Sequence, residues 1–120
     1  MIQVCIVDDD ASVRKSLANL LKSAGIATLS FASGEAFLAS SAAHDSACVL
    51  LDLRMQGMHG LEVQRRLRAA GEPVGVICMS AHDDEESVSA ALQGGAACFL
   101  RKPFSEAVLM AAIAPWVEAV

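Results

Sequence analysis

Short apolar runs recur along the chain, separated by longer stretches in which polar residues are more frequent. Runs of four to six apolar residues between such stretches favour β-strands over helices. The predicted strands cover residues 3–7, 26–30, 47–51, 74–79 and 98–101. The last three runs show little alternation of polar and apolar residues, which is typical of strands buried on both faces of a parallel sheet.

Between these runs, apolar residues are spaced three or four positions apart, as on one face of an α-helix. The clearest example has Val13, Leu17, Leu20, Leu21 and Ala24, followed by a glycine that is placed to stop the helix. Further helices are predicted around residues 34–40, 63–70, 88–92 and 109–116.

Five strands that alternate with five helices predict an α/β fold, with a doubly wound parallel sheet and helices on both faces. A chain of 120 residues fits a single domain, residues 1–120. Ser105 is placed as the N-cap of the last helix, whereas Pro115 lies late in that helix and is expected to kink or end it.

Composition predicts an aliphatic core, since 54% of the residues are apolar and only 4% are aromatic. The cysteines are dispersed and form no CxxC pair; they are Cys5, Cys48, Cys78 and Cys98. Each lies in an apolar run, which favours a role as a small core residue over a metal or disulfide role.

The formal charge of −5 argues against tight binding of this chain to nucleic acid phosphates. No apolar run approaches the roughly 20 residues that a membrane-spanning helix needs. The N-terminal residues lack a basic leader, so a cytoplasmic protein without a membrane partner is expected.

Polar residues terminate four of the five predicted strands. The first strand runs into 8–10, which are three aspartates, the third into Asp52, the fourth into Ser80, and the fifth into Lys102. In an open parallel sheet, ligands bind beyond the carboxyl ends of the strands. These side chains are therefore expected to meet at one edge of the sheet.

This combination of side chains is suited to phosphoryl transfer. Gathered carboxylates repel one another, and a hard cation such as Mg²⁺ relieves that repulsion. Lys102 supplies a point charge for a small anion, and the Ser80 hydroxyl can donate a hydrogen bond to one anion oxygen. Asp52 is the natural nucleophile because an ionised carboxylate needs no base to activate it.

The same residues carry a resemblance to a known family. Val7-Asp8-Asp9, the segment 50–55 around Asp52, Ser80-Ala81 and Lys102-Pro103 occur in the order and spacing of response-regulator receivers. The sequence resembles this CheY-like family along essentially its whole length. The resemblance implies a flavodoxin-like sheet with strand order 2-1-3-4-5.

The resemblance also implies the chemistry of the site. Mg²⁺ would be bound by Asp9, Asp52 and the main-chain carbonyl of Arg54, with Asp8 acting through water. Asp52 would be phosphorylated by a sensor histidine kinase, and Ser80 and Phe99 would form the switch pair. The Lys102–Pro103 peptide bond would be cis.

Segments 31–38 and 102–104 look most like receivers of the FixJ/LuxR type, which usually precede a helix-turn-helix DNA-binding domain. Transcriptional output would then depend on a DNA-binding domain absent from this chain. In such receivers, phosphorylation often produces a homodimer. Its face would be built here from the helix around 88–92, the strand 98–101 and the last helix. Gln56 departs from the family, which usually has proline there, so the loop after Asp52 is expected to be less rigid.

Other interpretations stay open. A haloacid-dehalogenase type phosphatase also uses an aspartate nucleophile, and Asp8-x-Asp10 mimics its opening motif, although its lysine precedes the final acidic pair whereas Asp83 and Asp84 precede Lys102. A pseudo-receiver would keep the fold and act only as a docking module. Asp10 is interpreted as a helix N-terminus residue, 83–86 as a charged helix start, and His82 as a possible border of the site.

Overall fold

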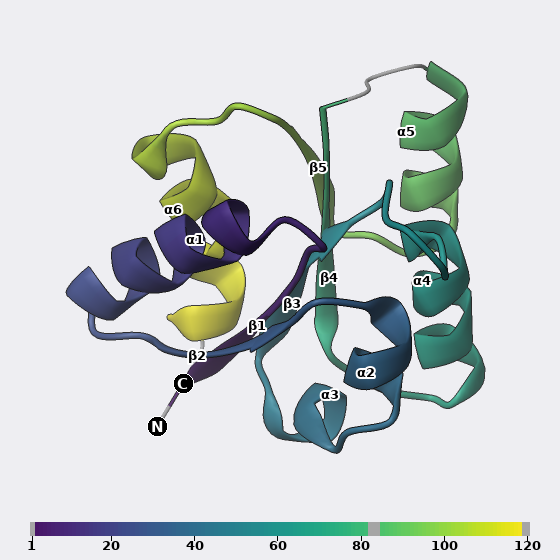
Figure 1. Cartoon of the computed structure of the whole chain (residues 1–120), viewed down its shortest axis with the longest axis horizontal. Helices are drawn as coiled ribbons and strands as arrows, with labels where there is room; N and C mark the ends of the chain where they lie inside the picture. The colour runs from purple at the N-terminus through teal and green to yellow at the C-terminus, as the bar shows by residue number, and fades with distance from the viewer. Residues whose placement is uncertain (1, 82–84, 119–120) are drawn as a thin grey trace.

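Five parallel strands form one sheet in the order β2-β1-β3-β4-β5 (Figure 1). The computed structural model describes residues 2–81 and 85–118. The strands are β1 Gln3–Val7, β2 Ala27–Phe31, β3 Cys48–Asp52, β4 Gly75–Ser80 and β5 Cys98–Arg101. The three that lie between the edge strands contain the most buried residues, and β3 and β4 are buried throughout.

Helices cover both faces of the sheet, with α1 and α6 on one face and the other helices on the opposite face (Figure 1). Their bounds are α1 Ala11–Ser23, α2 Gly34–Leu38, α3 Ala42–Asp45, α4 Gly60–Ala69, α5 Glu85–Gln93 and α6 Glu106–Val117. Each face carries its own aliphatic cluster. Leu21 and Ile113 pack on one face, and Phe37 and Val63 on the other.

The predicted fold class and strand order are confirmed, and every strand lies within one residue of its predicted bounds at each end. One element was missed. The helix α3 has only four residues, Ala42–Asp45, which is too short for a helical period to appear in the sequence. The helix predicted over 34–40 ends at Leu38.

Pro115 does not end the last helix, so that part of the prediction is wrong. The helix α6 continues to Val117, and the Glu118 N–H donates to the Ala114 carbonyl at 3.0 Å. Trp116 and Val117, beyond the proline, pack against the aliphatic cluster of that face. Burial of these side chains offsets the backbone hydrogen bond that a proline cannot make.

The helix starts agree with the sequence. Asp10 caps α1 by accepting hydrogen bonds from Ser12 N and Val13 N, and Ser105 caps α6. Glu85 begins α5, whereas Asp83 and Asp84 lie outside the described residues.

The cysteines lie in the core, as predicted. Cys5, Cys48 and Cys78 are buried, Cys98 is partly buried, and all four are free thiols. Burial raises the pKa of both Cys48 and Cys78 to about 12. In the part of the chain that the structure describes, no helix has the length and apolar character needed to cross a membrane.

Candidate phosphoryl-transfer site

Three carboxylates meet at the carboxyl end of the sheet. Asp8 and Asp9 follow β1, and Asp52 is the last residue of β3, the strand paired with β1 in parallel. One oxygen from each carboxylate lies within 4.8 Å of the others. The parallel pairing of the two strands is what brings together side chains more than forty positions apart in the sequence.

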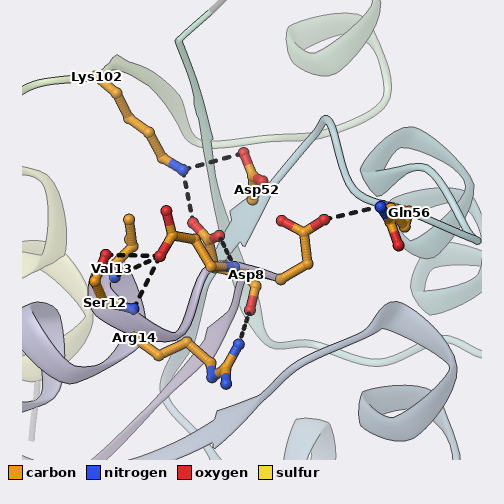
Figure 2. Close-up of polar contacts among 9 residues, drawn as sticks. Asp8, Ser12, Val13, Arg14, Asp52, Gln56 and Lys102 are labelled. Carbon is orange, nitrogen blue, oxygen red and sulfur yellow. Dashed lines mark hydrogen bonds and ion pairs between the residues drawn. The ribbon is translucent and has the colours of Figure 1, made fainter.

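Asp8 is the most firmly held of the three. Its side chain is buried, its Oδ1 accepts from Asp10 N at 2.9 Å, and its Oδ2 lies 2.6 Å from Lys102 Nζ (Figure 2). Its main-chain carbonyl accepts from Arg14 Nη1 at 2.8 Å. These contacts fix the position of a buried carboxylate next to two further carboxylates.

Lys102 enters from the segment after β5 and lies between two carboxylates (Figure 2). Besides the contact with Asp8, its Nζ is 3.3 Å from Asp52 Oδ1. Burial of the ammonium group works against its charge, but the hydrogen bond to Asp8 and the charges of Asp52 and Asp8 outweigh it, so the pKa of Lys102 is raised. The amine is thus held in its cationic form.

Asp52 is only 5% exposed, and burial together with the charge of Asp8 raises its pKa to about 6, although Lys102 acts in the opposite direction. A carboxylate in this environment is stabilised by added positive charge. Three oxygen donors in one cluster form the set that Mg²⁺ prefers, so the residues fit this ion.

Asp9 is exposed and makes a different kind of contact. Its Oδ2 accepts from the main-chain N–H of Gln56 at 3.0 Å. Gln56 and Lys102 approach the cluster from different sides (Figure 2). Asp9, Arg54 and Gln56 line one shallow pocket, so the loop after β3 forms a wall of the site.

The start of α4 lies directly against the end of β3. A Cβ atom on Gly60 would be 2.5 Å from the Asp52 carbonyl oxygen and 2.7 Å from Leu53 Cα, and the Gly60 N–H donates to the Leu53 carbonyl. Sequence reasoning missed Gly60, Arg14 and the Gln56 N–H. A main-chain donor leaves no trace in the side-chain pattern, although a glycine at a helix start is a visible signal.

Ser80 and Phe99 lie on neighbouring strands and on the same face of the sheet. Phe99 is the register partner of Cys78, two residues before Ser80, and side chains two residues apart point to the same face. Ser80 is buried at the end of β4, whereas Phe99 is partly buried against the cluster below α4 and α5. The Lys102–Pro103 bond is cis, as the resemblance implied. His82 lies outside the described residues.

A doubly wound parallel sheet that carries clustered carboxylates and a lysine beyond its strand ends is the arrangement expected of a response-regulator receiver. The family model described as "Response regulator receiver domain" matches residues 4–114. The chain therefore belongs to the response regulator receiver family of two-component systems. This match does not support the phosphatase or the pseudo-receiver interpretation.

The curated relatives include transcriptional regulators. The chain is 42% identical to the transcriptional regulatory protein FixJ of Azorhizobium caulinodans over 93% of the chain and 53% of that protein. It is 40% identical to the response regulator protein TmoT of Ectopseudomonas mendocina over 92% of the chain and 50% of that protein. The chain thus spans about half the length of the curated relatives it matches.

Solved structures agree in fold and in sequence. The structure titled FixJ-N has a TM-score of 0.88 at 37% identity and covers the whole of this chain and 96% of its own. A response regulator receiver protein from Burkholderia phymatum has a TM-score of 0.84 at 41% identity, with 98% of this chain and 96% of that chain covered.

Proposed function

We propose that Asp52 accepts a phosphoryl group from a sensor histidine kinase, with Mg²⁺ as the cofactor. The observation that carries this proposal is the cluster of Asp8, Asp9 and Asp52 with Lys102 in contact with two of the three. In the transfer, an Asp52 carboxylate oxygen forms a bond to phosphorus. The P–N bond of the donor phosphohistidine breaks, and the imidazole leaves with its electron pair.

The other residues have distinct roles in this proposal. Asp9, Asp52 and the main-chain carbonyl of Arg54 would hold Mg²⁺, and Asp8 would contribute through water. When bound, the ion would supply positive charge opposite the phosphoryl oxygens. The ammonium group of Lys102, which is already cationic, moves away from its carboxylate partners and binds a phosphoryl oxygen. The Ser80 hydroxyl donates a hydrogen bond to another phosphoryl oxygen.

The test is phosphorylation by a small donor, acetyl phosphate, in the presence of Mg²⁺. Borohydride trapping followed by mass spectrometry is expected to place the label on Asp52 alone. The Asp52→Asn variant is expected to take up no phosphate, and labelling of that variant to the same extent would contradict the assignment. Asp45→Asn, a change of the same chemistry on the exposed end of α3, serves as the matched control and keeps full labelling.

The proposed output is a change in the surface formed by α5, β5 and α6. Ser80 moves toward the phosphoryl group, small Ala81 does not refill the space, and Phe99 turns inward. That surface then joins two copies of the chain as a homodimer. Because relatives about twice as long are transcriptional regulators, the proposed output is transcription through a DNA-binding domain that the described residues do not contain.

A further inference from the structure

Two main-chain N–H groups of the loop between β3 and α4 approach carboxylates of other elements. Gln56 N donates to Asp9 Oδ2 at 3.0 Å, and Met58 N lies 3.4 Å from Glu35 Oε1 at the start of α2. Gly57 stands between them with a φ of 79°, a conformation in which glycine has no steric cost. This turn allows two amides close in sequence to reach carboxylates on different elements.

The contact at Gln56 depends on the residue type at this position. A proline has no N–H and could not donate to Asp9. The sequence had indicated a less rigid loop because Gln56 stands in place of proline. The rigidity of the loop stays a prediction. The structure shows a charge-assisted hydrogen bond at that residue, and this bond belongs to the proposed metal site.

The contact also constrains Asp9 itself. Asp9 is exposed, and it lies among two other carboxylates that repel its charge. A hydrogen bond to one of its oxygens opposes that repulsion and fixes the side-chain torsions, while the second oxygen remains available as a ligand. Groups that hydrogen-bond a ligating carboxylate in this way set metal affinity without touching the metal.

We propose that Gln56 is a positioning residue, whose main-chain N–H holds Asp9 in place for Mg²⁺ and raises the affinity of the site for the ion. The inference rests on the proposed function, because it assumes that Asp9 is a ligand. The raised affinity for Mg²⁺ comes from the main-chain N–H of Gln56, and the exposed side chain of Gln56 does not contribute to it.

The test compares Mg²⁺ affinity, measured by calorimetry, in the parent chain, Gln56→Pro and Gln56→Ala. Gln56→Pro removes the N–H and is expected to weaken Mg²⁺ binding about tenfold, the lower end of the range for lost partners of a ligand. Gln56→Ala shortens the side chain and retains the N–H, so the loss must appear in the proline variant and not in the alanine variant. Equal losses in both, or a proline variant that binds as tightly as the parent or more tightly, would overturn the inference.

A second measurement needs no change at Gln56. In the metal-free protein, the Gln56 amide proton is expected to exchange slowly and to resonate downfield, and both signatures are expected to disappear in Asp9→Ala. An amide resonance of Gln56 that is unchanged in Asp9→Ala would mean that Gln56 N–H does not donate to Asp9 in solution. If the parent itself fails to bind Mg²⁺, the proposed function fails instead, so the two results are distinguishable.

Discussion

At the scale of single residues, Asp52 is held in a state that costs free energy. Its carboxylate is buried beside Asp8, and its pKa is about 6 instead of the ordinary value near 4. Asp52 must be ionised to act as a nucleophile. The burial that shields the site works against this, because it favours the protonated form of the carboxyl group. Lys102 supplies part of the compensating positive charge, and Mg²⁺ bound as proposed would add to it.

The raised pKa predicts how stability varies with pH in metal-free protein. Between about pH 4 and pH 6 the folded state holds a proton on Asp52 that the unfolded state has lost, so the free energy of unfolding falls as the pH rises through this window. Asp52→Asn cannot ionise and is expected to exceed the parent by about 1 to 3 kcal/mol at pH 7.5, with the difference vanishing near pH 4. Urea unfolding with a chelator at both pH values measures it. A stability difference of equal size at both pH values would contradict the explanation.

Gly60 predicts a different residue-scale effect. A Cβ there would meet the Asp52 carbonyl oxygen and Leu53 Cα, which are backbone atoms of β3 and its continuation. Gly60→Ala is therefore expected to cost about 1 to 3 kcal/mol of stability and to slow phosphorylation of Asp52. Gly71→Ala, at the other end of α4, is the control. Gly71 has a φ of 70° and no atom near its Cβ position, so this variant is expected to lose stability while its phosphorylation rate is retained. If phosphorylation is slower in both Gly60→Ala and Gly71→Ala, the slower rate in Gly60→Ala follows from lost stability alone.

At the scale of elements, the sequence predicted strands and helices that have a regular apolar pattern or a distinctive residue at one end. The strands β3 and β4 are continuous apolar runs, and Asp10 and Ser105 are recognisable caps, so these elements were found nearly to the residue. The helix α3 was missed because one turn has no period. Pro115 was misjudged because packing of Trp116, which lies more than thirty residues from its partners in β4, is not visible locally.

The packing of α6 on β4 can be tested through Trp116, the only tryptophan. A Cβ on Gly75 would lie 2.5 to 2.8 Å from three atoms of the indole ring. Gly75→Ala is therefore expected to displace the ring, to shift its fluorescence to longer wavelength and to lower the free energy of unfolding by about 1 to 3 kcal/mol. Unchanged emission would mean that the ring does not depend on this close approach. Because Gly75 begins β4 and Ser80 ends it, phosphorylation of Asp52 should persist in the folded variant.

At the scale of the whole molecule, β5 connects the candidate site to the proposed contact surface, because Lys102 follows this strand and the surface contains it. The sequence predicted the residues of the site, because each terminates a strand, and the sheet order then brings Asp8, Asp9, Asp52 and Lys102 together. Their distances and the hydrogen bond from Gln56 could not be predicted, since they depend on the path of the loop after β3 and on main-chain groups.

The proposed homodimer is a prediction about that contact surface. Leu92 of α5 is 46% exposed and Val108 of α6 is 47% exposed, and both helices contact β5. Leu92 and Arg101 line one groove. Exposed apolar side chains of this size gain free energy when a second copy covers them. A bias of only ~1.4 kcal/mol between two conformations changes their ratio about tenfold, so a local event at Asp52 suffices to expose or rearrange the surface.

Sedimentation at about 100 μM, a concentration that corresponds to roughly −5.5 kcal/mol, is expected to show a monomer without beryllofluoride and a dimer with this phosphoryl mimic. Leu92→Glu is expected to abolish the dimer, whereas Leu29→Glu, a change at a 43% exposed leucine on the opposite edge strand β2, is expected to leave it intact. A monomer in both states, or equal loss in the two variants, would remove this surface as the site of self-association.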